Sequence, residues 1–190
     1  MEETDGDLLG KYFKGDVDAL GALVEKYRRS MFGFILNMTR GRDEADEIFQ
    51  EVWFRAIKNI GKYSEKNFSG WLMRIAHNIV IDRMRRKKPD FSLDAETEDG
   101  KSLHPTVAGK GLGPGEEVAE RDVGRRIAKA VATLPADQKE VFLLRVQAGL
   151  SFREIAEIQE VSINTALARM HYALGKLRLV LKEDYRQLVT

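Results

Sequence analysis

The sequence contains no cysteine, so it can form neither a disulfide framework nor a thiolate metal site. No apolar run approaches the roughly 18 residues that suggest a membrane-spanning helix. The first ten residues are acidic, whereas a secretory signal peptide begins with basic residues and continues with apolar ones. These absences predict a cytoplasmic protein that does not insert into membranes by itself.

Histidine is scarce as well, and His77, His104 and His171 lie far apart along the chain. They do not have the spacing of metal ligands, and no cysteine nucleophile is present. Nothing in the sequence forms a catalytic set. We therefore predict that the chain is not an enzyme, has no catalytic residues, and needs no cofactor and no metal.

Charge is abundant and is separated into blocks, although the formal net charge is only +1. Acidic residues dominate Asp43–Glu51 and Asp90–Asp122, whereas basic residues dominate Arg83–Lys88 and the sequence after Ser162. Blocks of opposite sign indicate several different partners. For each single block, a solvated helix surface remains an open alternative.

Apolar residues recur at helical spacing throughout the chain, without strong period-two alternation. We expect helices that begin near Asp16 and Asp43, a third from about Phe68 to Lys87, and further helices from Glu117 onward. The segment in between is rich in Gly, Pro, Ser and acidic residues, which is typical of a mobile linker. The expected fold is all-α, with an N-terminal helical bundle at 1–89, a flexible acidic linker at 90–116 and a C-terminal helix-turn-helix domain at 117–190.

The segment Ser151–Arg178 has the pattern of a helix-turn-helix. Ser151 and Glu154 form a capping box for a short helix, and Ser162 can cap the longer helix that follows. On the longer helix we expect an inward stripe of Ile163, Met170, Leu174, Leu177 and Leu181, with Leu167 near its edge. Opposite to it, where a second helix would meet the major groove of DNA, we expect Thr165, Arg169, Tyr172 and Lys176. A plain helical hairpin with a solvated face is the alternative.

Taken together, these segments resemble a known family. In chain order, "GDVDALGALVEKY", "DEADEIFQEVWFRA", "FSGWLMRIAHNIVIDRMRRKK" and the sequence from "LPADQKEVFLLR" to the helix-turn-helix are similar to the extracytoplasmic-function sigma factors of bacterial RNA polymerase. The resemblance covers nearly the whole chain. It implies a factor that binds core RNA polymerase, directs it to specific promoters, helps open the duplex near −10 and so initiates transcription.

The resemblance also assigns partners and domains. It implies that residues 1–89 bind core polymerase and recognise and melt the −10 element, and that residues 117–190 recognise the −35 element. The implied partners are the clamp helices of the largest polymerase subunit, the flap region, promoter DNA and an anti-sigma factor. A different class stays open: a helix-turn-helix repressor that never binds polymerase.

The helix after Asp43 is expected to dock on polymerase, because an acidic face with an outward Phe54 suits a basic helical partner. Its candidate residues are Asp43, Asp46, Glu47, Gln50, Glu51 and Phe54. The third helix combines bases with aromatic rings, which single-stranded DNA needs for phosphate neutralisation and stacking. The candidates for −10 DNA are Tyr63, Lys66, Asn67, Phe68, Trp71, Arg74, Asn78, Arg85 and Lys88. We expect Tyr63 and Asn67 to form a pocket for an extruded base, whereas Phe68 and Trp71 could equally be core.

The helix-turn-helix supplies the candidates for −35 DNA, which are Arg153, Ser162, Asn164, Thr165, Arg169, Tyr172, Lys176 and Arg178. Asn164, Thr165 and Arg169 are expected at base edges, and Arg153, Lys176 and Arg178 at phosphates. Leu167 stands where the family often has a lysine. Arg169 could therefore be the main phosphate anchor instead of a base reader.

Overall fold

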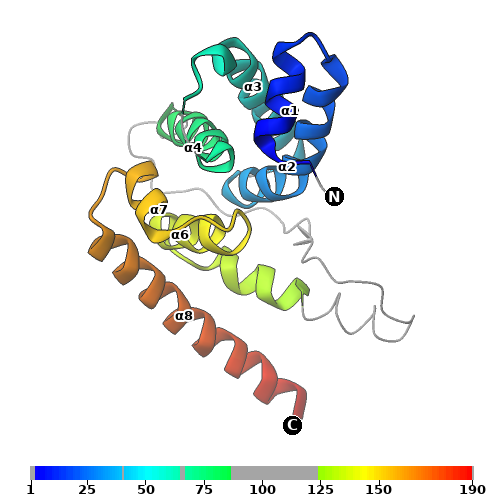
Figure 1. Ribbon diagram of the computed structural model, residues 1–190. Coiled ribbons are helices and arrows are strands. Elements are labelled where there is room, and N and C mark those ends of the chain that lie inside the picture. The colour runs from blue at the N-terminus through cyan, green and yellow to red at the C-terminus, as the bar shows by residue number, and fades with distance from the viewer. Residues whose placement is uncertain (1–2, 40, 65–66, 87–123, 190) are drawn as a thin grey trace.

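The computed structural model describes residues 3–39, 41–64, 67–86 and 124–189, and side chains are described up to Lys182. These parts of the chain contain helices and no strands, so the expected all-α class is confirmed (Figure 1). The N-terminal half contains α1 (Asp5–Phe13), α2 (Val17–Met38), α3 (Arg42–Asn59), a short 3-10 turn η1 (Ile60–Lys62) and α4 (Phe68–Arg86). The C-terminal half contains a helix at 124–132, then α6 (Ala136–Val146), α7 (Phe152–Ile158) and α8 (Ile163–Val189). The expected linker at 90–116 lies outside the described residues.

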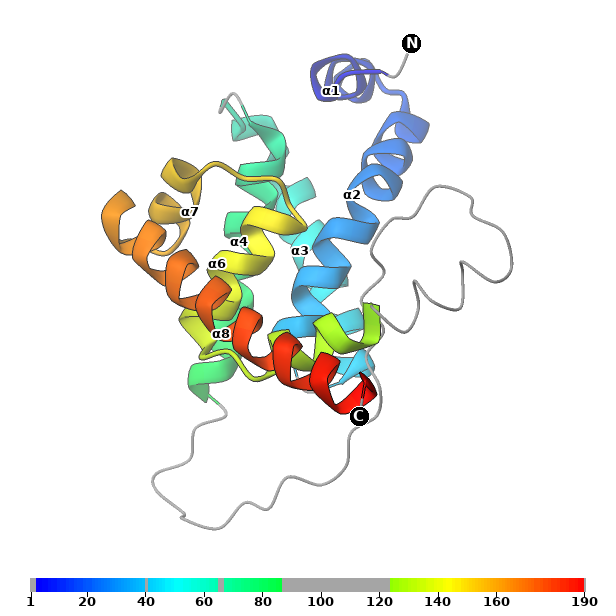
Figure 2. The ribbon, with the colours of Figure 1, turned by 90° about the horizontal axis from the view of Figure 1, so that it is seen from below.

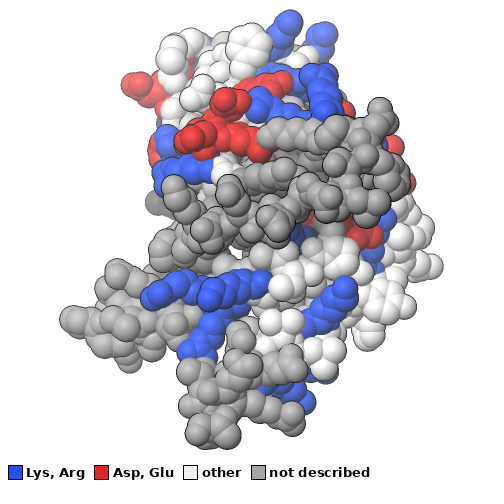
Figure 3. All heavy atoms as spheres, turned by 180° about the vertical axis from the view of Figure 1, so that it is seen from behind, with Lys and Arg blue, Asp and Glu red and all other residues white. Residues whose placement is uncertain are grey.

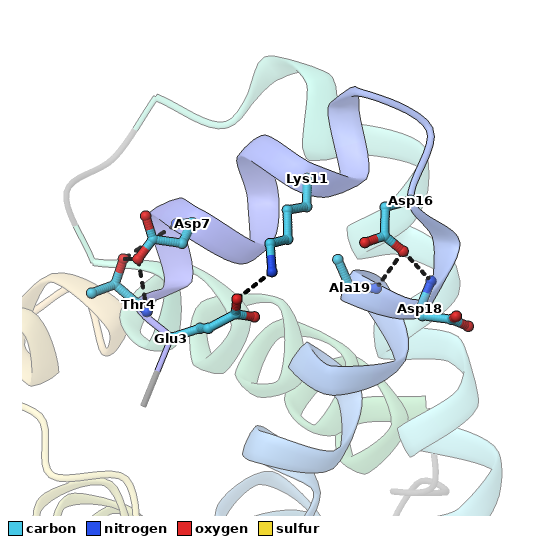
Figure 4. A network of polar contacts seen from close by, with 7 residues as sticks. All are labelled: Glu3, Thr4, Asp7, Lys11, Asp16, Asp18 and Ala19. Carbon is cyan, nitrogen blue, oxygen red and sulfur yellow. Dashed lines mark hydrogen bonds and ion pairs between the residues drawn. The ribbon is translucent and has the colours of Figure 1, made fainter. Parts of the chain in front are cut away.

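Local capping explains where the first two helices begin (Figure 4). Thr4 and Asp7 form a capping box, in which the Thr4 hydroxyl accepts from the Asp7 amide at 3.2 Å and the Asp7 carboxylate accepts from the Thr4 amide at 3.1 Å. The expected cap at Asp16 is present, because its carboxylate accepts from the amide of Asp18 at 3.0 Å. Helix α1 itself was not expected from the sequence.

Helices α2, α3 and α4 pack around one apolar core in the N-terminal half. Fully buried side chains from all three helices meet there, among them Leu23, Phe34, Ile48, Phe68 and Leu72. Burying side chains of this size stabilises a fold by about 1.5–3 kcal/mol each relative to exposure. This core fixes the outer faces of α3 and α4, which carry the candidate binding residues.

In the C-terminal half, α8 packs across α6 and α7. The expected capping box at Ser151 and Glu154 starts α7, and the Ser162 hydroxyl accepts from the Thr165 amide at 3.0 Å at the start of α8. Between these helices, Glu160 adopts a left-handed φ of 54°, which lets the chain reverse within a few residues. The result is a short helix, a tight turn and a long helix, as the sequence predicts.

The inward face of α8 differs from the expected one. Ala166 and Ala173 are fully buried and Leu177 is 6% exposed, whereas Ile163 and Leu174 are 44% and 46% exposed. Placing Ile163 and Leu174 inward was therefore wrong. Ala166, Ala173 and Leu177 thus form the buried line of α8, and Ile163 and Leu174 lie at its margin.

The two halves touch through α4 against α7 and through α2 against α6 (Figures 1 and 2). Helix α8 lies on the outside of the C-terminal half and runs away from this contact toward the C-terminus. The polar residues of α4 and of α8 are consequently in different surroundings.

Candidate binding surfaces on three helices

Helix α3 presents an acidic outer face with an exposed aromatic residue in it. Asp43, Asp46, Glu47 and Gln50 are exposed, and the ring of Phe54 is 70% exposed. Ile57, one turn further on, adds another 40% exposed apolar side chain. A large apolar group that stays in water beside carboxylates is what a protein docking surface requires.

Part of this acidic face is already paired with α4. Arg83 donates to Glu47 at 2.8 Å and to Glu51 at 3.2 Å. Burial opposes ionisation of the Glu51 carboxyl, but hydrogen bonds from Arg83 and Arg55 outweigh it, so the pKa of Glu51 is lowered. The Glu51 side chain is 31% exposed and binds the guanidinium groups of Arg55 and Arg83. Sequence reasoning placed Arg83 in a basic run and missed this pairing.

An aromatic cluster connects η1 with the start of α4. The ring centroid of Tyr63 lies 5.3 Å from that of Phe68 and 5.2 Å from that of Trp71. Phe68 is 1% exposed and also contacts Tyr27 at 5.7 Å, so it belongs to the core. Its placement among the DNA-binding candidates was wrong, because its ring is enclosed by α2 and α4. Tyr63 and Trp71 are half-buried against the same core.

The polar face of α4 contacts the C-terminal half. The Asn67 amide donates to Glu154 of α7, while its oxygen accepts from the Gly70 amide at 3.2 Å. Arg74 lies 3.6 Å from Glu157 of α7, and His77 contacts Glu140 of α6. Burial opposes ionisation of Glu154, but bonds from Ser151 and Asn67 hold the pKa of its carboxyl below the usual value. No pattern in the sequence indicated these contacts.

The remaining candidates for −10 DNA divide into two groups. Asn78 and Arg85 are exposed on α4. Lys66 and Lys88 lie outside the described residues.

Helix α8 exposes a polar surface from its first turn onward. Seven of the expected −35 residues are exposed, namely Arg153, Ser162, Asn164, Thr165, Tyr172, Lys176 and Arg178. The hydroxyls of Ser162 and Thr165 lie 2.8 Å apart, which orders the first turn. Figure 3 shows the opposite face of the molecule from Figure 1, where basic side chains predominate over the lower, C-terminal half and acidic ones gather over the upper half.

Arg169 does not share this exposed surface. Its side chain is 26% exposed, and its guanidinium group turns toward α6 and α7, where it forms an ion pair with Asp137 and donates a hydrogen bond to Gln159. The expectation that Arg169 lies outward beside Thr165, Tyr172 and Lys176 was therefore wrong. The two partners lie 32 and 10 residues away in sequence, beyond the reach of a helical-wheel pattern.

The described parts of the chain contain no group of three or more His, Cys, Asp or Glu side chains that could hold a metal ion. Among the helices described, none is both long and apolar enough to cross a membrane.

Two segments of the chain match known families. Residues 23–89 match Sigma-70 region 2, and residues 124–177 match Sigma-70 region 4. The chain is 34% identical over 173 residues to the ECF RNA polymerase sigma factor SigW of Bacillus subtilis, which covers 90% of this chain and 92% of that protein. It is 28% identical over 176 residues to the RNA polymerase sigma-H factor of Pseudomonas aeruginosa, covering 90% and 91%.

The fold is similar to two solved structures. One is CnrH in complex with the cytosolic domain of CnrY, with a TM-score of 0.66, 20% identity, and coverage of 96% of this chain and 99% of that one. The other is the sigma factor RpoE in complex with the anti-sigma factor NepR from Bartonella quintana, with a TM-score of 0.65, 21% identity, and coverage of 87% and 98%.

Proposed function

The chain belongs to the extracytoplasmic-function sigma factors of bacterial RNA polymerase, and from that premise we propose which of its surfaces carries out each step of initiation. As a member of this family it binds core RNA polymerase, directs the enzyme to promoters and helps open the DNA. The observation that carries this function is that region 2 and region 4 both match, in order, within one chain. Binding, rather than catalysis, is its task, and we propose that it has no enzymatic activity.

Residues 1–89 form the polymerase-binding and −10 domain, 90–116 the linker, and 117–190 the −35 domain. The outer face of α3 docks on the clamp helices of the largest polymerase subunit. Phe54 is the apolar anchor of this surface, and the exposed residues Asp43, Asp46, Glu47 and Gln50 extend it toward the N-terminal end of α3. Aromatic anchors within a polar rim carry most of the energy of protein interfaces.

The start of α4 receives the single strand at −10. Tyr63 and Trp71 offer ring faces for stacking, which is worth about 1–3 kcal/mol per base. Asn67, which directly precedes α4, and Arg74 on α4 supply polar and basic groups, and Asn78 and Arg85 extend the surface. Phe68 supports this surface from the core rather than touching DNA.

The N-terminal part of α8 enters the major groove of the −35 element. Asn164 and Thr165, which are exposed in its first turn, face base edges, whereas Lys176, Arg178 and Arg153 reach phosphates. The region-4 match covers Arg153, Asn164, Thr165 and Lys176 and ends one position before Arg178.

The protein acts in the cytoplasm, where promoter DNA and polymerase are. An anti-sigma factor regulates it. This part of the proposal is supported by the relative RpoE of Bartonella quintana, which is bound by the anti-sigma factor NepR in its solved structure.

Transcription in a reconstituted system tests this function. Core polymerase with the full chain should give run-off transcripts from a subset of fragments of a genomic library, and core polymerase alone should not. If the chain binds DNA but never supports a transcript, it acts as a repressor and the proposal fails.

A further inference from the structure

The guanidinium group of Arg169 joins three helices of the C-terminal half. From α8, its Nε forms an ion pair with Asp137 Oδ2 at 3.1 Å, and a terminal nitrogen donates to Gln159 Oε1 at 2.8 Å. Asp137 lies in the first turn of α6, and Gln159 is the residue that ends α7. The positive charge of Arg169 therefore faces a carboxylate of its own chain.

The orientation of the Gln159 amide is fixed from its other end. Its Nε2 donates to Glu140 Oε2 at 2.6 Å and to the carbonyl oxygen of Asp137 at 3.3 Å. A carboxylate and a carbonyl accept hydrogen bonds, so the amide must turn its nitrogen toward them and its oxygen toward Arg169. Glu140 is 4% exposed and also contacts His77 of α4, so it is held in place on both sides.

This arrangement bears on how α8 binds DNA. An arginine that projects freely from a recognition helix attracts the phosphates of any duplex, since that attraction does not depend on sequence. Each phosphate contact makes the slope of log K against log salt concentration more negative by about 0.9. One such contact therefore costs about 3.5-fold in affinity between 50 and 200 mM salt. A guanidinium group paired with Asp137 contributes less to such binding.

We propose that Asp137 is a specificity-determining residue for −35 recognition: by pairing with Arg169, it keeps this charge from binding phosphates of any sequence. Glu140 is a positioning residue that acts in the same direction through Gln159. The inference rests on the proposed role of α8 in reading the −35 element. Its consequence is that discrimination between promoters depends on a carboxylate of α6 that does not touch DNA.

The experiment uses the full chain and short duplexes. A cognate −35 duplex is first selected from a random pool by binding to the wild-type protein. Affinities for the cognate and a scrambled duplex are then measured across a salt series. Asp137→Asn should bind the scrambled duplex about three- to tenfold more tightly at low salt and steepen its salt slope by about 0.9, so the preference for the cognate duplex falls.

Glu160→Gln is the matched control. It changes the net charge by the same amount, at an exposed carboxylate in the turn between α7 and α8. Its effect on both duplexes should be small and equal. Glu140→Gln, which can offer an N–H where Gln159 needs an acceptor, should act like Asp137→Asn with a smaller change.

A double variant tests whether the effect runs through Arg169. In an Arg169→Ala background, Asp137→Asn should change binding no more than Glu160→Gln does. If Asp137→Asn equals Glu160→Gln in the wild-type background, or has its full effect without Arg169, the inference is overturned. If the wild-type protein enriches no sequence at all, the proposed role of α8 is wrong and the inference falls with it.

Discussion

The N-terminal and C-terminal halves hold their candidate binding residues in different ways. In the N-terminal half several charged and polar candidates already have partners within the protein: Glu47 and Glu51 bind Arg83, and Asn67 and Arg74 contact carboxylates of α7. In the C-terminal half the candidates of α8 are exposed to solvent, with Arg169 as the exception. If α4 binds single-stranded DNA, the contacts of Asn67 and Arg74 with α7 have to be exchanged, whereas the candidates on α8 are already exposed.

The largest expected effect concerns the aromatic residues of the two halves. Phe68→Ala should lower the free energy of unfolding by about 3–5 kcal/mol, because it empties a fully buried site. Tyr172→Ala on α8, where the ring is 63% exposed, should change it by less than about 0.5 kcal/mol. Urea denaturation measures both. Similar losses for the two variants would contradict the assignment of Phe68 to the core and Tyr172 to a surface.

Phe54, unlike Phe68, is an exposed aromatic residue of the N-terminal half, and we expect it to matter for binding rather than for folding. Phe54→Ala should weaken binding to core polymerase by about 1–3 kcal/mol, since truncating an interface anchor has this effect. The matched control is Phe13→Ala, at a ring that is 58% exposed elsewhere on the surface. Titration of labelled protein with core enzyme measures both affinities. Equal affinities for the two variants would mean that Phe54 is not part of the interface.

A smaller effect is expected where α4 meets α7. Combining Glu154→Gln with Glu157→Gln removes the carboxylates that contact Asn67 and Arg74, and glutamine at position 154 retains the capping box. Partly exposed ion pairs are worth about 0–1 kcal/mol, so single-stranded −10 DNA should bind up to about fivefold more tightly. Anisotropy with a labelled oligonucleotide measures this, with Glu160→Gln as the control. Unchanged affinity would mean that α7 does not compete with DNA for α4.

The smallest effect belongs to α8. Lys176→Ala should weaken binding of all duplexes by the same factor and reduce the salt slope by about 0.9, because a lysine at a phosphate carries no sequence information. Affinities for selected and scrambled −35 duplexes across a salt series provide the measurement. A loss confined to the selected duplex would instead place Lys176 at a base edge.

Local signals in the sequence predicted much of the fold. The caps at Asp16, Ser151 and Ser162 depend on residues two or three positions apart, so they could be found without a structure. The same signal at Thr4 and Asp7 would have revealed α1. The inward face of α8 was misplaced because hydrophobicity was weighted above size, whereas Ala166 and Ala173 form the contact.

The polar contacts of the site could not be predicted in the same way. Arg83 finds Glu47 across 36 residues, and His77 finds Glu140 across 63. Such pairs depend on how helices pack, and they leave no periodic pattern in the sequence. Asp137 and Gln159 were overlooked for this reason, although Arg169 itself was among the candidates.

The contact between α4 and α7 bears on the distance along DNA that the two halves could span. The names of the two promoter elements place them about 25 base pairs apart, which at about 3.4 Å per base pair is about 85 Å along B-form DNA. Even α8, with 27 residues, is only about 40 Å long. Arg74 lies 3.6 Å from Glu157, so α4 and α7 are in contact in this arrangement. If α4 binds the −10 element and α8 the −35 element, as we propose, we expect the two halves to move apart along the DNA.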